Sequence, residues 1–456
     1  MNNLYAGFAR TNITPMMGIA ISGYFIPRNA EAILDDLEIN AIAVKCDDEC
    51  AIMLSVDLLY VETYIANECK KKIAERLGIS EEAVFIHATH THTGPFLDPG
   101  RKAERGNDEG TDMIIEYRSF FIRRAVDVAE AAYKDLKPAK MGYAVGKAEN
   151  IAFLRRFIMK DGSVKTNPGV NNPDIVRPVG ELDTSVNVVR FEREGANSIA
   201  LVNFADHPDV VGGCKISADW PGFFRRTLEK ALDGVSAVLF NGAQGDVNHV
   251  NVHPTGGYLN DMFMDFDDVA RGYGHSRYMG RVVAGSVLQV WDKVNYVDVD
   301  SIKYAQRIVN VPSNMPRPED MPEAHRINDL HKAGKDEEIP YTGMMLTTVV
   351  AEAGRMVRLE HGPEFFPMTF TALSIGNVAF FGIPGEPFNA IGKGVKESEG
   401  WDLIIPCCLT NGAEGYFPMK DAYDQGGYEA RSSNFKAGVA ELIIENGKRM
   451  LSELKA

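Results

Sequence analysis

The chain of 456 residues contains no apolar run long enough to cross a bilayer, and it begins without the basic, apolar and small-residue order of a secretory signal. It has only six cysteines and no paired Cys-x-x-Cys motifs of the kind that hold a structural zinc. It has no basic excess either, because 63 acidic and 48 basic side chains give a formal charge of −15. A field of that sign disfavours nucleic acids and anionic membranes as partners. We therefore expect a cytoplasmic protein with reduced thiols and no integral membrane association; its oligomeric state stays open.

What the chain does have is an alternation of strand-like and helix-like segments. Residues 51–57 form an apolar run ending in an acid, and residues 64–77 repeat apolar side chains at helical spacing. The same order returns at residues 198–204, 221–232 and 237–240. The alternation predicts an α/β fold with a mixed central sheet flanked by helices. A closing amphipathic helix is predicted over residues 433–454.

Histidines are concentrated in residues 87–95, which read HATHTHTGP. Residues two apart in a strand point to the same face, so His90 and His92 are expected to project together from the strand at residues 84–86. A pair of hydrogen-bonded core histidines is the alternative, but two imidazoles on one face favour metal binding or catalysis. The segment alone selects no metal, because imidazole suits Zn, Fe, Cu and Ni alike.

A catalytic zinc needs about three protein ligands, so partners are expected elsewhere in the chain. His207 directly follows the strand at residues 200–204, which places it at a strand end as well. Glu386 lies in a Pro-Gly turn after another apolar strand, where a metal ligand and an acid at a helix N-terminus are equally good interpretations. The remaining histidines are interpreted as follows: His249 and His253 follow another strand end, while His275, His325, His331 and His361 lie on the surface.

Taken together and in order, these motifs resemble the N-terminal catalytic domain of the neutral/alkaline ceramidases, zinc-dependent hydrolases that cleave the amide of N-acylsphingosine. The resemblance covers nearly the whole chain and comprises TNITP at 11–15, THTHTGP at 89–95, FADHP at 204–208, NGAQGDV at 241–247, PGE at 384–386, and Tyr416, Tyr423 and Tyr428. It implies a single catalytic domain over residues 1–456, with two interleaved α/β lobes as the alternative, and without the family's C-terminal β-sandwich domain.

The resemblance also implies the site residues. The zinc ligands carried over from the family are His90, His207, Glu386 and Tyr416. The tyrosine rests on its spacing to the two tyrosines that follow it, because phenolate is an unusual ligand.

Roles for non-ligand residues follow from the same resemblance. His92 is similar to the family's general base, and Tyr428 and Arg155 to the groups that bind the substrate carbonyl oxygen. Arg156 is nearly as good a choice as Arg155 for contacting the substrate.

This chain departs from the family where the ceramidases carry a serine after the Gly-Asp-Val segment. Asn248 stands at that position, so a water mechanism must carry the reaction and Asn248 is expected to contact substrate. We therefore predict a zinc-dependent hydrolase acting on the amide of a small, polar, N-acyl molecule. A zinc esterase, a lactonase or a sugar-directed enzyme on the same site is the alternative. The alternative that is not an enzyme is a metal-bearing binding protein. A second metal, held by His249 or Asp246, is left open.

Overall fold

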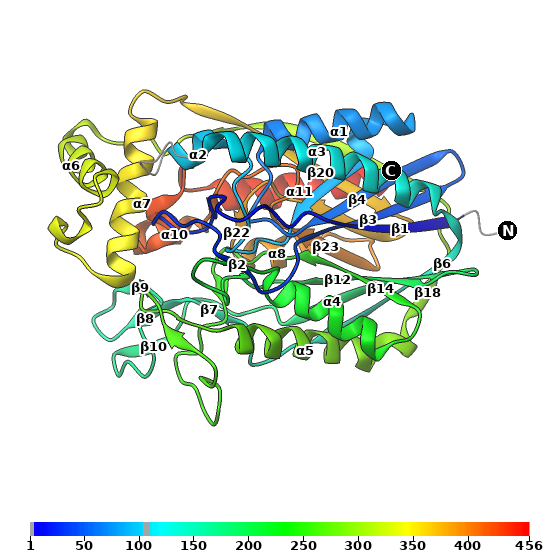
Figure 1. The fold of residues 1–456 in the computed structure, drawn as a ribbon, viewed down its shortest axis with the longest axis horizontal. Helices are drawn as coiled ribbons and strands as arrows, with labels where there is room; N and C mark the ends of the chain where they lie inside the picture. Colours follow the sequence, from blue (N-terminus) through cyan, green and yellow to red (C-terminus); the bar gives the residue numbers. More distant parts are fainter. Residues whose placement is uncertain (1–3, 104–109, 456) are drawn as a thin grey trace.

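Two β-sheets stacked face to face form the centre of the molecule, in a computed structural model that describes residues 4–103 and 110–455 (Figure 1). The larger sheet runs in the order β14 (Val235–Asn241), β12 (Ser198–Phe204), β11 (Ser185–Arg193), β6 (Lys137–Lys147), β1 (Leu4–Asn12), β3 (Glu38–Cys46), β4 (Glu49–Val56) and β5 (Val84–Ala88), and β18 (Asn295–Val297) pairs with β6. The smaller sheet runs in the order β19 (Ile302–Pro312), β20 (Phe365–Ile375), β21 (Val378–Gly382) and β23 (Leu403–Cys407). Parallel pairs such as β4–β5, β12–β14 and β21–β23 stand among antiparallel ones, so both sheets are mixed.

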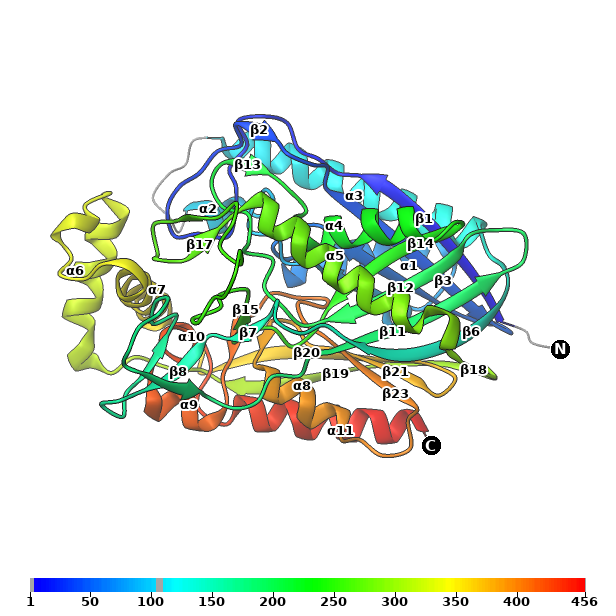
Figure 2. The ribbon, with the colours of Figure 1, turned by 90° about the horizontal axis from the view of Figure 1, so that it is seen from below.

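Helices cover the outer face of each sheet, which produces the layers seen in Figure 2. Helices α1 (Thr63–Leu77) and α3 (Thr111–Lys134) share a core with strands β3, β4 and β5, and α4 (Asp219–Ala231) and α5 (Tyr273–Val290) share one with β11, β12 and β14. Helices α8 (Asn389–Lys396) and α11 (Val439–Lys455) pack on the smaller sheet. A further core between the sheets contains side chains of both, including Phe240 and Phe380. The α/β fold with a mixed central sheet flanked by helices, predicted from the sequence, is confirmed.

Burial on both faces explains why several strands read as continuous apolar runs. In β4 every residue from Cys50 to Val56 is buried, because α1 and α3 cover one side and the smaller sheet the other. Helix α1 ends at Gly78, whose φ of 69° is the left-handed conformation that glycine adopts without strain. Its backbone N–H donates to the carbonyl of Ala74 and closes the helix.

The two sheets are joined where their strands end. The side-chain amide of Asn203, near the end of β12, donates to the carbonyl of Phe240 in β14 and to that of Pro406 in β23. Beyond β23, the carboxamide oxygen of Asn411 accepts from the backbone N–H of Ile86 in β5. The carboxyl ends of β5, β12, β14 and β23 are therefore neighbours, although they belong to two sheets.

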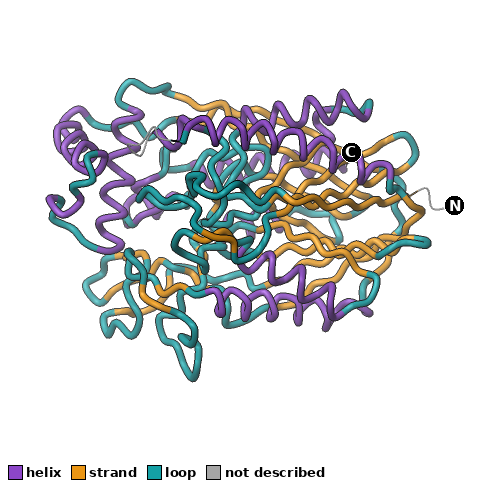
Figure 3. Tube along the Cα trace, viewed as in Figure 1, coloured by secondary structure: helices purple, strands orange, loops and turns teal. Residues whose placement is uncertain are grey.

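Helices α6 (Met321–Lys332) and α7 (Gly343–Leu359) pack on each other around a separate core, at the end of the molecule away from both termini (Figures 1 and 3). We call them the α6–α7 unit.

The remaining helices are α2 (Pro99–Ala103), α9 (Lys420–Gln425) and α10 (Tyr428–Ser432), with short 3-10 turns at Glu81–Ala83, Trp291–Lys293, Pro318–Asp320 and Asp336–Glu338. The remaining strands are β2 (Ala32–Ile33) with β13 (Lys215–Ile216), β7 (Phe153–Leu154) with β15 (Val247–Asn248), β16 (Phe263–Met264) with β17 (Ala270–Arg271), β22 (Glu386–Pro387) with β24 (Tyr416–Phe417), and β8 (Arg156–Met159) between β9 (Val164–Thr166) and β10 (Ile175–Pro178). Across the described ranges, none of the helices combines the length and apolarity needed to span a bilayer.

Candidate metal centre and active site

Two histidines and a glutamate meet where strands of both sheets end. His90 follows β5, His207 follows β12, and Glu386 opens β22 shortly after β21. The Nε2 atom of His90 lies 3.2 Å from Oε2 of Glu386, and Nε2 of His207 lies 3.1 Å from the same oxygen. All three side chains are buried. Segments more than a hundred residues apart thus place two ring nitrogens and a carboxylate oxygen at one point.

The backbone around His90 differs from the sequence prediction. Strand β5 ends at Ala88, and His90 has a φ of 79°, so His90 and His92 do not share the face of a strand; that prediction was wrong. Hydrogen bonds from the backbone N–H of His90 to Leu58 and from that of His92 to Pro208 hold the turn instead. The turn still brings the two rings together, with their Nε2 atoms 3.4 Å apart.

The ring orientation of His90 and His207 is set by backbone carbonyls. Nδ1 of His90 lies 2.8 Å from the carbonyl oxygen of Leu59, and Nδ1 of His207 lies 2.8 Å from that of Gln244 and 2.9 Å from that of Val247. A carbonyl oxygen only accepts hydrogen bonds, so Nδ1 carries the proton in each ring and the Nε2 lone pair is left for another partner. Metal-binding histidines are oriented in this way.

The electrostatics of this point favour a cation. Burial, together with the nearby Arg155 guanidinium, lowers the pKa of His207 to about 4, so its ring is neutral and its Nε2 lone pair faces the Glu386 carboxylate. Two Nε2 lone pairs that face one carboxylate oxygen at 3.2 and 3.1 Å repel it unless a cation lies between them. Lone pairs and a carboxylate converging in a buried place are a donor set for a metal ion.

Tyr416 and His92 flank this donor set. The Tyr416 hydroxyl lies 3.4 Å from Nε2 of His207. Burial and the Glu386 carboxylate raise the pKa of Tyr416 well above 10, although the Arg155 guanidinium opposes them. Within the described part of the chain, the group of three or more histidine, cysteine or acidic side chains suited to a metal consists of His90, His92 and His207, whose ligand atoms lie within 4.8 Å of one another. Its nitrogen donors suit zinc but also other transition metals.

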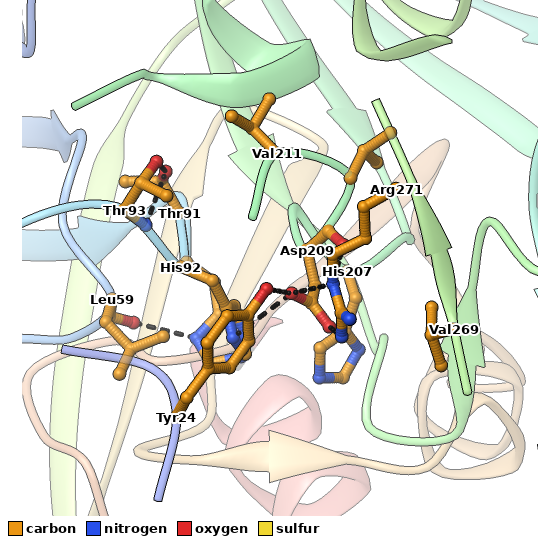
Figure 4. Close-up of polar contacts among 12 residues, drawn as sticks. Tyr24, Leu59, Thr91, His92, Thr93, His207, Asp209, Val211, Val269 and Arg271 are labelled. Carbon is orange, nitrogen blue, oxygen red and sulfur yellow. Dashed lines mark hydrogen bonds and ion pairs between the residues drawn. The ribbon is translucent and has the colours of Figure 1, made fainter. Parts of the chain in front are cut away.

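The other side of His92 faces a second carboxylate (Figure 4). Nδ1 of His92 lies 3.5 Å from Oδ1 of Asp209. The Tyr24 hydroxyl donates to the same oxygen at 2.6 Å, and the Arg271 guanidinium donates to both carboxylate oxygens at 3.1 and 2.8 Å. Burial would raise the pKa of Asp209, but Arg271 and His92 hold it well below its usual range. Asp209 is therefore a carboxylate aimed at the His92 ring.

Sequence reasoning missed Tyr24, Asp209 and Arg271. Sequence reasoning could have found Asp209, because this acid lies two residues after His207 in the loop that follows β12. Glycine is required at position 23, beside His92. Its φ is +113°, and a Cβ there would come within 3.0 Å of the Cα and ring of His92.

Arg155 lies beside Tyr416 and Tyr428. Its guanidinium carbon is 5.4 Å from the centre of the Tyr416 ring and 5.8 Å from that of Tyr428, and the two rings are 5.4 Å apart in an edge-to-face arrangement. Nε of Arg155 donates to Glu429 at 2.6 Å and Nη2 donates to the carbonyl of Gly245 at 2.8 Å. The structure thus brings Arg155 and Tyr428 to the same place as the histidines, through Tyr416.

Arg156 and Asn248 lie outside this cluster. Arg156 donates to Gln425 and to the carbonyl of Gly426, and its guanidinium lies 5.4 Å from the ring of Phe388. The Asn248 side chain donates to Asn167 at 3.0 Å and accepts from the backbone N–H of Val250 at 3.1 Å. Their contacts with substrate stay predictions.

Each of the two residues considered for a second metal has one polar atom in a hydrogen bond. Asp246 accepts from the backbone N–H of Asn389 at 2.6 Å, and Nε2 of His249 lies 2.8 Å from the carbonyl oxygen of Ala270. His275, which the sequence placed on the surface, is buried, and its ring centre lies 5.9 Å from that of His249; that prediction was wrong.

A cavity of about 190 Å³ opens beside Glu386, Tyr416 and Tyr428. Its opposite wall is built from helices α2, α6 and α7. We call this space the side cavity. It gives a small molecule a place next to the histidine cluster.

Comparisons with known proteins connect this arrangement to a fold. No protein-family model matches the chain, and the search of curated proteins finds no match. Among solved structures, the chain is similar to the neutral ceramidase from Pseudomonas aeruginosa, with a TM-score of 0.73 and 15% identity over 100% of this chain and 75% of that one. It is similar to a ceramidase complexed with C2 as well, with a TM-score of 0.74 and 15% identity over 100% of this chain and 76% of that one. The chain therefore has the fold of the part of those ceramidases that it covers, as the motifs predicted.

Proposed function

We propose that the protein is a zinc-dependent amidohydrolase that cleaves the C–N bond of a small, polar, N-acyl compound. The observation that carries the proposal is the convergence of the Nε2 atoms of His90 and His207 on one oxygen of Glu386, with His92 and its carboxylate partner alongside. The likeness in fold to ceramidases, which the names of those structures identify as enzymes acting on ceramide, supports hydrolysis of an amide.

The residues that would hold the metal are His90, His207, Glu386 and Tyr416. Their nitrogen and oxygen donors fit zinc, and the carbonyls behind His90 and His207 keep the two Nε2 lone pairs turned toward Glu386. Zinc bound there would supply a Lewis acid that polarises the amide carbonyl and lowers the pKa of water to about 7.

His92 would move protons in this mechanism. Its Nε2 lies beside the ligand cluster, 3.4 Å from Nε2 of His90, and its Nδ1 faces Asp209. With the Nδ1 proton directed at Asp209, Nε2 can accept a proton from the attacking water and pass it to the leaving amine. The Asp209 carboxylate then stabilises the positive charge that the ring acquires.

Arg155 and Tyr428 would bind the carbonyl oxygen as it gains negative charge. Hydrogen bonds to Glu429 and Gly245 fix the Arg155 guanidinium beside the two tyrosine rings, so little reorganisation is needed during the reaction. A well-placed donor of this kind contributes roughly 3 kcal/mol to the stability of the transition state. Arg156, packed against Phe388, is less well placed for this role.

The wall of the side cavity favours a polar substrate. Arginine, histidine, asparagine and glutamate residues are among those that line it.

The test is a screen of zinc-loaded protein against N-acyl amino acids, simple esters and lactones, with metal-stripped protein as the control. We expect amide hydrolysis that disappears on stripping and returns when zinc is added back. Turnover of esters or lactones without any amide would establish the alternative hydrolase on the same site, and retained activity after stripping would refute the metal mechanism.

A further inference from the structure

We propose that Gly354 of α7 is a specificity-determining residue, because the side chain that it lacks leaves room in the side cavity for an alkyl or aromatic group next to the scissile amide. The inference rests on the proposed function, because it concerns the substrate preference of the same site. Gly354 belongs neither to the histidine cluster nor to any of the motifs that indicated the site.

Two faces of α7 have different neighbours. Val349 and Ala353 belong to the core that α7 shares with α6. Ala351, Gly354 and Arg358 instead line the side cavity. Residues three or four positions apart lie on the same side of a helix, so a side chain at position 354 would point toward the cavity.

Glycines in other helices have an evident packing reason. Glycine destabilises the interior of a helix relative to alanine, so its presence there calls for an explanation. A Cβ added at Gly280 in α5 would lie 2.6 Å from the Cβ of Phe223, and one added at Gly392 in α8 would lie 2.7 Å from the Cβ of Ala243. At both positions a neighbouring element comes too close for any side chain.

No such close approach explains Gly354. Its φ lies outside the left-handed region, so alanine would fit the backbone. Apart from the backbone of α7 itself, the one heavy atom of the described residues within 4 Å of an added Cβ is Nη1 of Arg358, at 3.7 Å. That distance is an ordinary van der Waals contact with the end of a flexible side chain. The fold therefore accepts a side chain at this position, and the effect of having none is on the cavity.

The side cavity extends from Gly354 to the residues proposed to bind the reacting group. Glu386, Tyr416 and Tyr428 line it together with Gly354. Phe25 lines it too, and its ring centre lies 6.4 Å from that of Tyr428 in an edge-to-face arrangement. A substrate whose carbonyl oxygen is bound by Tyr428 therefore has its neighbouring groups in the space that α7 bounds.

The part of the wall around Gly354 is suited to an uncharged group. Val350 and Ala351 lie in the preceding turn of α7, and Phe25 packs against the core of the α6–α7 unit. All three line the cavity and are apolar. Apolar side chains bind alkyl and aromatic groups by removing them from water, and a larger residue at position 354 would take up the space that such a group needs.

The test measures kcat/KM of zinc-loaded protein on two series of probes: N-acylglycines from acetyl to hexanoyl, and N-acetyl amino acids from glycine to phenylalanine. The first series lengthens the acyl group and the second enlarges the amine part, so they show which part enters the side cavity. We expect Gly354→Leu to lower the ratio of kcat/KM between the largest and the smallest member of at least one series by about tenfold or more. Gly354→Ala should lie between wild type and Gly354→Leu.

Gly285 offers a matched control. It also lies in a helix, α5, no heavy atom of the described chain outside that helix's own backbone comes within 4 Å of an added Cβ, and it does not line the side cavity. Gly285→Leu should therefore leave both series unchanged. Gly354→Ala and Gly285→Ala should each raise Tm by about 1 °C, because alanine is the better helix former. A lower Tm in Gly354→Ala would mean that packing requires the glycine, which overturns the inference.

The outcomes separate this inference from the proposed function. Amide hydrolysis with the same size preference in Gly354→Leu as in wild type overturns the role of Gly354 and leaves the hydrolase proposal standing. Probe binding is also measured by calorimetry on zinc-loaded His92→Ala, with and without Gly354→Leu. If no amide is hydrolysed but Gly354→Leu weakens binding of the larger probes by about tenfold or more, the hydrolase proposal fails while the role of Gly354 stands. A panel that is neither bound nor hydrolysed overturns both.

Discussion

Glu386, which is buried, and Asp209, which is half-buried, are two carboxylates on opposite sides of the histidine cluster, and their surroundings differ. Asp209 receives hydrogen bonds from Tyr24 and Arg271, so the protein itself compensates its charge. Oε2 of Glu386 instead faces the Nε2 atoms of His90 and His207, and the Nδ1 atoms of both rings are already directed at carbonyls. The comparison teaches that one side is suited to hold a ring in place, whereas the other is suited to bind a cation.

The largest effect is expected when the Glu386 carboxylate is removed. Glu386→Ala removes one of the proposed ligands, so zinc should fall from about one ion per chain to near zero and activity by about a thousandfold or more. Elemental analysis of the dialysed protein measures the first quantity. Glu414→Ala, which removes another carboxylate from the same cavity wall, should keep its zinc. Full zinc occupancy in Glu386→Ala would contradict the assignment.

His92→Ala is expected to have the next largest effect, and it separates loss of the proton acceptor from loss of the metal. We expect zinc to be retained and kcat to fall by about 10²- to 10⁴-fold, because a general base is lost while the ligands remain. Metal content and kcat are measured on the same preparation. Loss of zinc together with activity would instead make His92 a third histidine ligand, which the distances between the three rings allow.

Asp209→Asn tests the contact between Asp209 and the His92 ring with little change in the shape of the side chain. We expect kcat to fall by about 10- to 100-fold with KM and zinc content nearly unchanged, because the amide orients the His92 ring less well and cannot offset its charge. Asp267→Asn is the control: Asp267 also binds Arg271, at 2.6 and 2.7 Å, but it does not face His92. Equal losses in both variants would indicate a purely structural role.

Glu62 is another buried carboxylate, and neither of its oxygens receives a hydrogen bond from the described residues. Burial raises its pKa to about 7, above the unfolded value, so the folded protein binds more protons than the unfolded chain between about pH 4.5 and 7. Stability from this group is therefore present below about pH 4.5 and is lost as the pH rises through 7. We expect Glu62→Gln to raise the free energy of unfolding by about 1–3 kcal/mol at pH 8 and by much less at pH 5.

Urea denaturation at the two pH values measures this smallest effect, which should leave zinc content unchanged. A gain of equal size at both values would point to packing, and a loss at pH 8 would mean that the carboxylate has a stabilising partner. Either result would remove the contrast between Glu62 and Asp209, whose charge the protein compensates.

Local patterns predicted the regular elements well. Residues 198–204 coincide with β12, and the helix predicted over residues 64–77 corresponds to α1, because apolar periodicity and a terminal glycine are local signals. The last helix was placed too early. It begins at Val439, and the residues before it include Phe435, which forms an isolated bridge with Ser313. A contact with a distant residue decided that boundary.

The amino-acid sequence by itself determined that His90, His207 and Glu386 follow strands, and the order of its motifs indicated the fold. Only the tertiary structure decided that these strand ends meet, although they belong to two different sheets. It placed His90 in a turn of positive φ rather than in a strand, and it brought Tyr24 and Arg271 to Asp209 across 185 and 62 residues of chain. The reason is physical: periodicity reports which face of an element is buried, whereas a site depends on which buried faces meet, and that is set by long-range packing.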